Sequence, residues 1–424
     1  MKVKKFCVAA GRMFGVAAVT LIVISMFAAS AAAQSHYKVL HRFNNTREQL
    51  DGTSPYGGVI LDADGNLYGT TAWGWGDPCY WHGCGIGFKL TQGSDGRWAE
   101  TVILKDFLWT DPGSWPMAGF VFDANGNLYG TTAGDYQCCG RVFAGTPNLD
   151  GSWTWTELHS FTGGTDGARP YAGLILDADG NLYGTTTGGG TYGYGVVFRL
   201  TKNSDGSWTE SVLHHFTGGR DGANPYSRLI LDGSGNLYGT TVNGGCAGYG
   251  VVFKLTPNTG GTWKEKVLHA FLGHPGKYPY SGLIFDTANN LYGTTYNGGP
   301  ADGGMVYKLA PNTNGTWTYS VLHVFTGTPG LHPVAGVVMD KAGNLYGNTV
   351  NGGSADAGTV YELTPNANGS WTYRVLHVFT GTPARNPYGD LLLDAAGNLY
   401  GTTAGGNMDC GNWADCGTVF EITP

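Results

Sequence analysis

The sequence is poor in charged residues and in the motifs of familiar enzymes. Of its 424 residues, 24 are Lys or Arg and 31 are Asp or Glu, so 13% are charged, about half of the usual fraction. No segment repeats apolar residues at helical spacing, which excludes a helical bundle and a coiled coil. The Gly-x-Ser-x-Gly elbow, the His-Glu-x-x-His helix and the phosphate-binding loop are also missing, so no reaction that depends on them is indicated.

Glycine and apolar residues are abundant instead. The chain has 72 glycines, 42% of its residues are hydrophobic and 13% are aromatic. This is enough apolar material to offset the conformational entropy lost on folding, so the glycine content indicates many turns and not disorder. We therefore expect a turn-rich, all-β protein.

Residues 1–33 have the three parts of a secretory signal peptide. Four cations precede an apolar run over residues 14–29 and a short alanine segment that ends at Ala33. This pattern predicts cleavage after Ala33 and a secreted, periplasmic or cell-surface protein; an uncleaved membrane anchor is the alternative. We expect residues 34–424 to form one domain, monomeric and without a further membrane-spanning segment.

The net charge bears on possible partners. It is −7 for the whole chain and becomes −11 when the four cations of the signal segment are removed. A negative domain repels phosphate backbones and anionic lipid headgroups. We therefore expect no nucleic-acid partner.

A sevenfold repeat dominates the sequence. The motif Asn-Leu-Tyr-Gly recurs every 54 or 55 residues after a first spacing of 61, and it begins at Asn66, Asn127, Asn181, Asn236, Asn290, Asn344 and Asn398. In the third unit, segments 173–176, 181–186, 195–200 and 208–216 alternate with turns rich in Gly, Asp and Asn. Such runs predict four antiparallel strands per unit, and seven units predict a seven-bladed β-propeller.

The two ends of the repeat array are complementary. Residues 37–43 match a fourth strand without its first three, and residues 417–423 match a third strand without its fourth. We expect the N-terminal strand to complete the seventh blade and close the ring, which leaves no exposed sheet edge. An open solenoid is the alternative, but it needs polar caps that the sequence lacks.

The repeated segments "GNLYGTT", "GG" and "GVVFKLTP" resemble the GloVer tandem repeat of bacterial exported "choice-of-anchor" proteins. The resemblance covers the whole mature chain and implies an exported repeat protein, but it transfers no catalytic chemistry. Members of that family often carry a C-terminal anchoring module. None follows the last repeat here, so the resemblance implies a released protein.

Two repeated polar series invite a metal interpretation. One is the aspartate that ends each first strand: Asp62, Asp123, Asp177, Asp232, Asp286, Asp340 and Asp394. We interpret it as an Asx turn, with a calcium loop as the alternative. The other is a histidine on the outermost strand: His41, His159, His214, His269, His323 and His377, with Lys105 in the corresponding place of the first full unit.

These histidines lie on different blades, so they are too far apart to bind one ion together. Hydrogen bonds to neighbouring turns are the expectation for them. We predict no metal and no cofactor.

Six tryptophans fall outside the repeat, in the irregular loops of units seven, one and two: Trp73, Trp75, Trp81, Trp109, Trp115 and Trp413. Ring closure makes these units neighbours. Aromatic faces beside polar groups suit a carbohydrate or protein ligand, so we predict a binding shelf there. The alternative is that these rings only pack long loops onto the rim.

A second candidate site lies at the mouth of the central channel. It involves the residues that precede the seven first-strand prolines, among them Trp115, Arg169 and His332. Close by, Arg228 and Asp390 replace a glycine that five other units have. These side chains are predicted to bind a ligand or to act in acid–base chemistry, unless Arg228 and Asp390 form an ion pair that fills the axis.

Cysteines occur in the variable loops. In an exported protein they favour disulfides, and Cys79 with Cys84 and Cys410 with Cys416 are the simplest pairs. A zinc site is the alternative, although these spacings differ from the usual Cys-x-x-Cys.

The sequence thus favours an exported, non-enzymatic propeller that binds a carbohydrate or protein ligand through its loop face. The alternative is a propeller enzyme of the lactonase, lyase or glycosidase type that acts at the channel mouth. No catalytic residue is assigned.

Overall fold

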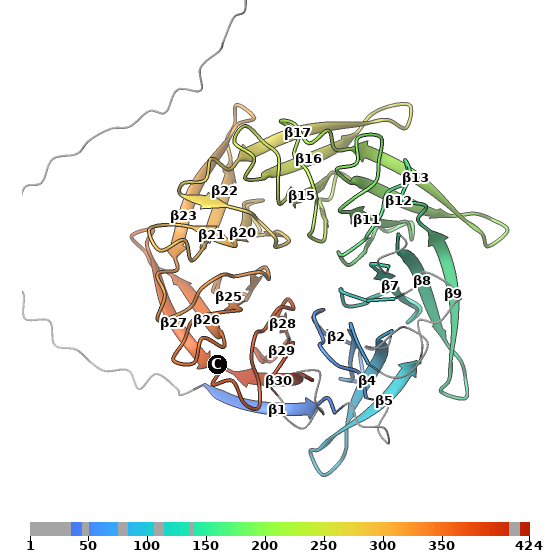
Figure 1. Ribbon diagram of the computed structural model, residues 1–424, viewed down its shortest axis with the longest axis vertical. Helices are drawn as coiled ribbons and strands as arrows, with labels where there is room; N and C mark the ends of the chain where they lie inside the picture. The colour runs from blue at the N-terminus through green and yellow to red at the C-terminus, as the bar shows by residue number, and fades with distance from the viewer. Residues whose placement is uncertain (1–34, 45–50, 75–83, 106–113, 135–138, 407–415) are drawn as a thin grey trace, which may run out of the picture. The chain divides into compact units, whose positions relative to one another are not determined.

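The computed structural model describes residues 35–44, 51–74, 84–105, 114–134, 139–406 and 416–424. Every regular element in these ranges is a β-strand. The strands form seven four-stranded antiparallel sheets around a central axis, which confirms the seven-bladed β-propeller (Figure 1).

The blades are numbered in chain order. Blade 1 has β2 (Ile60–Leu61), β3 (Leu67–Thr71), β4 (Ile86–Gln92) and β5 (Trp98–Leu104); blade 2 has β6 (Val121–Phe122), β7 (Leu128–Thr132), β8 (Arg141–Pro147) and β9 (Trp153–Ser160). Blade 3 has β10 (Ile175–Leu176), β11 (Leu182–Thr186), β12 (Val196–Lys202) and β13 (Trp208–His215); blade 4 has β14 (Ile230–Leu231), β15 (Leu237–Thr241), β16 (Val251–Pro257) and β17 (Trp263–Ala270); blade 5 has β19 (Ile284–Phe285), β20 (Leu291–Thr295), β22 (Met305–Pro311) and β23 (Trp317–Val324). Blade 6 has β24 (Val338–Met339), β25 (Leu345–Thr349), β26 (Thr359–Pro365) and β27 (Trp371–Val378); blade 7 has β28 (Leu392–Leu393), β29 (Leu399–Thr403), β30 (Thr418–Thr423) and β1 (His36–Arg42). A further short pair, β18 (Gly276–Lys277) and β21 (Asn297–Gly298), joins two loops of the fifth blade.

The N-terminal strand closes the ring as predicted. β1 pairs antiparallel with β30, from His36 opposite Thr423 to Arg42 opposite Thr418, and completes the seventh sheet in the order β1-β30-β29-β28. In Figure 1 the first strand and the last lie side by side. The pairing of β1 with β30 therefore joins the two ends of the described chain.

The first strand of each blade is shorter than the sequence indicates. In blade 3 the predicted run 173–176 contains only Ile175 and Leu176 as paired residues, and Pro170 lies five residues before them. The intervening residues 171–174 form no ladder and include a bend at Ala172.

A bulge recurs between the third and fourth strands. In blade 3, Val197 pairs with His214 and Phe198 with Val212, so one residue of β13 is skipped. In blade 1 the same skip pairs Gly87 with Leu104. Leu104, and not Lys105, is therefore the counterpart of the histidines, and the prediction for Lys105 was wrong.

The core lies between neighbouring blades. Phe198 is completely buried in an inter-blade cluster, and its counterparts in the other blades are buried as well. Each such ring contributes roughly 1.5–3 kcal/mol by leaving water. The glycine of the repeated motif makes room for this ring, because a Cβ on Gly184 would lie 2.5 Å from the Phe198 ring.

The repeated aspartate acts in its turn, as predicted. Asp177 Oδ1 accepts hydrogen bonds from the backbone N–H groups of Asp179 and Asn181, and Oδ2 accepts from the side chains of Asn181 and Tyr183 at 2.8 and 2.9 Å. Burial raises the pKa of Asp177, but these bonds outweigh it and lower the pKa overall. The carboxylate is thus committed to the turn.

The histidine series joins each blade to the next in two ways. His269, His323 and His377 stack on Tyr319, Tyr373 and Tyr37 of the following blade, with ring centroids 4.3, 4.0 and 3.8 Å apart. His41, His159 and His214 instead face Asp51, Asp166 and Asp221 at 3.1, 3.6 and 3.2 Å. His41 and His214 thus make the predicted hydrogen bonds to turns. His159 Nε2 lies too far from Asp166 for one, and stacking replaces these bonds in the first group.

Candidate functional site

Connections between blades build the mouth of the channel. The residue before each connecting proline has a left-handed backbone, with φ between 55° and 69° at Ser54, Trp115, Arg169, Asn224, Tyr278, His332 and Asn386. The N–H of Arg169 donates to Cys139 of the preceding blade, and its carbonyl accepts from Thr187 of its own blade. Such a conformation costs about 1–3 kcal/mol, which these two hydrogen bonds, one between blades and one within the blade, offset.

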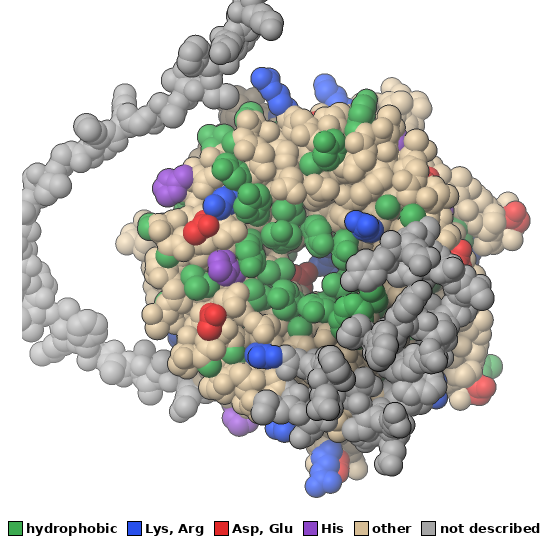
Figure 2. Space-filling model, viewed as in Figure 1, with side chains coloured by type: hydrophobic (Ala, Val, Ile, Leu, Met, Phe, Trp, Pro, Cys, Tyr) green, Lys and Arg blue, Asp and Glu red, His purple; other side chains and the backbone are tan. Residues whose placement is uncertain are grey.

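The residue after each proline lines the channel. Five of these residues are tyrosines, and Met117 and Val334 take the two remaining places. We call the tyrosines the tyrosine collar: Tyr56, Tyr171, Tyr226, Tyr280 and Tyr388. They border a cavity of about 840 Å³ on the axis, and Figure 2 shows hydrophobic side chains, a class that includes tyrosine, gathered around this opening.

The collar consists of two aromatic arcs. In the first, Tyr226 stacks on Tyr171 with centroids 4.7 Å apart and contacts Tyr280 at 5.4 Å. Tyr296 continues this arc, 5.5 Å from Tyr280. In the second, Tyr388 contacts Tyr56 at 5.2 Å.

Four of the five collar hydroxyls have a pKa raised above the ordinary value of a phenol. Burial raises the pKa of Tyr226, Tyr280 and Tyr388, and neighbouring phenols raise it further. Burial also raises the pKa of Tyr56, although a hydrogen bond with Trp73 opposes the effect. These four hydroxyls can therefore both donate and accept a hydrogen bond at neutral pH.

The cavity holds two predicted charged residues. Arg228 and Asp390 both line it, from blades 4 and 7. Asp390 Oδ1 accepts a 2.8 Å hydrogen bond from the backbone N–H of Gly336, and Arg228 is exposed. Among the ion pairs of the described residues none joins Arg228 to Asp390, so the alternative of an axial ion pair is not supported.

Arg169 and His332 border the collar but do not line the cavity. His332 stacks on Tyr296 with centroids 4.6 Å apart, and its Nδ1 lies 3.4 Å from Asn351 Oδ1. The Arg169 side chain is exposed, and its charge acts on Tyr226. The residues that line the cavity thus follow the connecting prolines, two positions after the residues that the sequence analysis named.

Part of the predicted tryptophan shelf is described. Trp73 and Trp115 are half-buried and meet edge to face with centroids 4.9 Å apart. Since Trp73 also contacts Tyr56, these rings continue the second aromatic arc outward. The other four lie outside the described residues: Trp75, Trp81, Trp109 and Trp413.

The structure describes one cysteine of each predicted disulfide. Cys84 and Cys416 are buried, whereas Cys79 and Cys410 lie outside the described residues. The two local pairs stay predictions.

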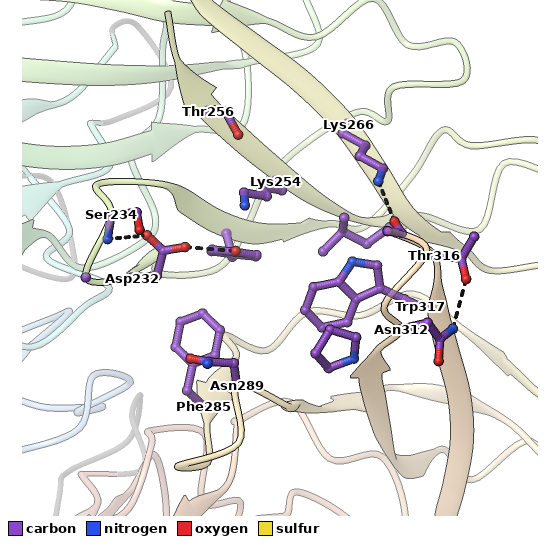
Figure 3. Close-up of a pocket in the computed structure, with 15 residues that line it drawn as sticks. Asp232, Ser234, Lys254, Thr256, Lys266, Phe285, Asn289, Asn312, Thr316 and Trp317 are labelled. Atoms are coloured by element: carbon purple, nitrogen blue, oxygen red, sulfur yellow. Dashed lines mark hydrogen bonds between the residues drawn. The ribbon is translucent and has the colours of Figure 1, made fainter.

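A second cavity, of about 650 Å³, lies between blades 4 and 5 (Figure 3). Tyr238 donates a 3.0 Å hydrogen bond to Asp232 and meets Trp317 with centroids 6.4 Å apart. The same tyrosine–tryptophan contact recurs between Tyr183 and Trp263 at 6.4 Å. This cavity is therefore a product of the repeat and not a special site.

The described residues include no helix that is long and apolar enough to cross a membrane. A sequence comparison with characterised proteins gives no significant match. In contrast, 263 chains of solved structures match the fold.

Three of these solved structures indicate the range of the fold. An ancestral GH74 enzyme matches with a TM-score of 0.57 and 10% identity over 91% of this chain and 51% of its own. A Bacteroides uniformis protein, provisionally assigned as a 6-phosphogluconolactonase, gives 0.48 and 14% over 76% and 84%. A Dyadobacter fermentans protein of unknown function gives 0.47 and 12% over 92% and 100%. At these identities the likeness concerns the fold alone.

Family membership rests on the repeat itself. The family model described as Gloeobacter/Verrucomicrobia repeat matches residues 82–303 and 230–424. These ranges include the third and fourth strands of blade 1 and all later blades. With its sevenfold Asn-Leu-Tyr-Gly motif and its propeller fold, the chain belongs to the Gloeobacter/Verrucomicrobia repeat family.

Proposed function

We propose that this protein is an exported, non-enzymatic propeller that binds a carbohydrate on the tyrosine collar at the mouth of its central channel. The observation that carries the proposal is the arc of aromatic rings from Tyr171 to Tyr296, which consecutive blades present to one cavity. Export is proposed from the signal-like segment 1–33.

The chemistry of the collar suits a sugar. Pyranose rings have flat C–H faces that pack on aromatic rings, and their hydroxyls need donors and acceptors close by. The neutral phenols supply both, and Arg228 adds a charged donor at the cavity wall. A volume of about 840 Å³ also lies within the usual range for ligand sites, roughly 300–1,000 Å³.

Arg228 and Asp390 are the observation that favours an enzyme as the second candidate. Hydrolysis of a glycosidic bond commonly needs two carboxyl groups that flank it. Asp390 is the single carboxylate among the described residues that line the cavity. Binding is therefore the better supported function.

A glycan array probed with residues 34–424 tests the proposal, followed by calorimetric titration of any sugar that binds. Replacing Tyr226 and Tyr280 together by Ala is expected to weaken binding about 10- to 100-fold, because two stacking surfaces are lost. Tyr192→Ala is the matched control, since Tyr192 is an exposed loop tyrosine outside the collar.

Equal affinity in the double variant would exclude the collar. Conversion of the bound sugar, detected by chromatography and abolished in Asp390→Asn, would favour the enzyme instead.

A further inference from the structure

Three side chains that can bind a metal meet where the ring closes. His41 is on β1, Asp51 follows in the connection to blade 1, and Glu100 is on β5. One ligand atom from each lies within 4.8 Å of the other two, and no second group of this kind occurs among the described residues. His41 Nε2 is 3.1 Å from Asp51 Oδ1 and 3.9 Å from Glu100 Oε2.

The cluster is shielded from water but short of hydrogen-bond donors. The side chains of His41, Asp51 and Glu100 are 16%, 9% and 13% exposed. Glu100 Oε1 is buried and has no hydrogen-bond partner among the described residues. Two carboxyl groups thus share this space, and no Lys or Arg among the described residues forms an ion pair with either of them.

The two sister junctions show what is different here. Asp166 and Asp221 each accept hydrogen bonds from the backbone N–H and the hydroxyl of a threonine, Thr162 or Thr217. At the closing junction the corresponding residue is Asn44, which donates only its backbone N–H, at 2.9 Å, to Asp51 Oδ2. Asp51 Oδ1 is therefore left facing His41.

We propose that His41, Asp51 and Glu100 bind a divalent transition-metal ion of the Zn²⁺ class at the junction between blades 7 and 1. Zn²⁺ takes nitrogen and carboxylate ligands at about 2.0–2.2 Å, so its ligand atoms lie roughly 3.4 Å apart in a tetrahedral site. The distances of 3.1 and 3.9 Å bracket that value. A fourth position remains for water.

Calcium fits the site less well. Ca²⁺ takes six to eight oxygen ligands, whereas this cluster offers one imidazole nitrogen and two carboxylates. Imidazole favours zinc and similar ions. The ligand set therefore selects the class of ion.

The three ligands come from separate segments, so the ion would connect the closing strand to the first blade. An ion that binds only the folded ring raises its apparent stability by mass action. The binding and the stability of the ring are thus measurable on the same protein.

The test is a calorimetric titration of EDTA-treated, desalted residues 34–424 with ZnCl₂, repeated with CaCl₂. We expect one Zn²⁺ per chain and a Tm that rises by several degrees with Zn²⁺ but not with Ca²⁺. Glu100→Gln should weaken Zn²⁺ binding more than 10- to 100-fold, which is the loss typical when a residue that only hydrogen-bonds a metal ligand is replaced. Glu265→Gln is the matched control, because Glu265 occupies the same strand position at a sister junction, and it should bind like the wild type.

The absence of stoichiometric Zn²⁺ binding would overturn the proposal. So would binding that survives Glu100→Gln, which would place the ion elsewhere, or equal losses in Glu100→Gln and Glu265→Gln. Circular dichroism and Tm in EDTA establish that each variant folds. If Glu100→Gln does not fold, Asp51→Asn carries the same expectation.

Discussion

Junctions on the two sides of the ring hold their blades together by different physics. Between blades 4 and 7, a histidine stacks on a tyrosine of the next blade. Between blades 2 and 4, the same histidine position faces an aspartate, and Glu210 or Glu265 replaces the tyrosine. The junction between blades 1 and 2 uses neither, because Leu104 and Trp155 occupy the two positions.

The replacements are coordinated. Leu104 lacks a polar head, and the facing Trp155 fills the space and donates a 3.0 Å hydrogen bond to the carbonyl of Ile103. The same two facing positions thus join neighbouring blades in three ways: by a histidine–tyrosine stack, by a polar cluster or by an apolar pair. On the tyrosine side, between blades 4 and 7, the junctions gain stability from packing. On the acidic side, between blades 2 and 4, the junctions must keep carboxyl groups partly out of water.

Deleting residues 35–43 should lower the stability most, because it removes Tyr37, which stacks on blade 6, and His41, which faces Asp51. Tyr37 stacks on His377, and Leu40 and Phe43 are buried, so roughly 5 kcal/mol or more of burial is lost. We expect a much lower Tm and association through the open edge of β30, measured by calorimetry and size-exclusion chromatography. A monomeric variant with unchanged Tm would contradict ring closure as a source of stability.

Tyr319→Ala and Glu265→Ala compare the two sides directly. The tyrosine variant loses a stack and much of its packing, which should cost about 2–4 kcal/mol. The glutamate variant loses a carboxyl group that burial disfavours, and its free energy of unfolding should change by less than about 1 kcal/mol. Urea denaturation measures both, and equal losses would remove the distinction.

Glu265→Tyr should convert one kind of junction into the other. A tyrosine there would stack on His214 as Tyr319 does on His269, and the gain should be about 0.5–1.5 kcal/mol. Glu265→Leu is the control, since it fills the space without a flat ring. A tyrosine variant no more stable than the leucine variant would show that the stack adds nothing beyond burial.

The smallest effect concerns pH. Burial and the charge of Asp221 raise the pKa of Glu265 to about 7. The folded state therefore binds the proton more tightly than the unfolded state, and stability falls as pH rises from about 4.5 through 7. Glu265→Gln should remove this part of the slope, as measured by Tm from pH 4 to pH 8.

The tyrosine side should respond in the opposite sense. Burial lowers the pKa of His323 and His377 to about 4, so the unfolded state binds protons more tightly there. Stability should fall as pH drops from about 6.5 through 4. A His323→Phe variant whose Tm depends on pH as the wild type does would contradict this assignment.

The fold was predictable because its signals are local. A motif with a period of 54 residues and four apolar segments per period determine the number of blades, and the matching end segments predict the closure. The bulge was not predictable, because skipping one residue of a strand leaves no trace in a single sequence. Counting from Trp98 would have given Leu104, but only the register explains why that count is the right one.

The candidate site was predicted only in part. Arg228 and Asp390 were found because they break the repeat, whereas the collar obeys it. The dipeptide Pro-Tyr occurs in five of seven connections, but a residue that follows the repeat gives no signal that separates a channel-lining role from a place in the first strand. The cluster of His41, Asp51 and Glu100 was not predictable, because it depends on contact between segments of different blades, which the repeat period does not reveal.

Closure by β1 also determines when the ring can be completed. During synthesis the first strand emerges before its partner β30, which lies more than 370 residues later in the chain. The outer strand of blade 7 must therefore wait through the assembly of six blades before it can pair. A chain that is cut short within its final repeat leaves this strand without a partner, so the pairing distinguishes finished molecules from unfinished ones.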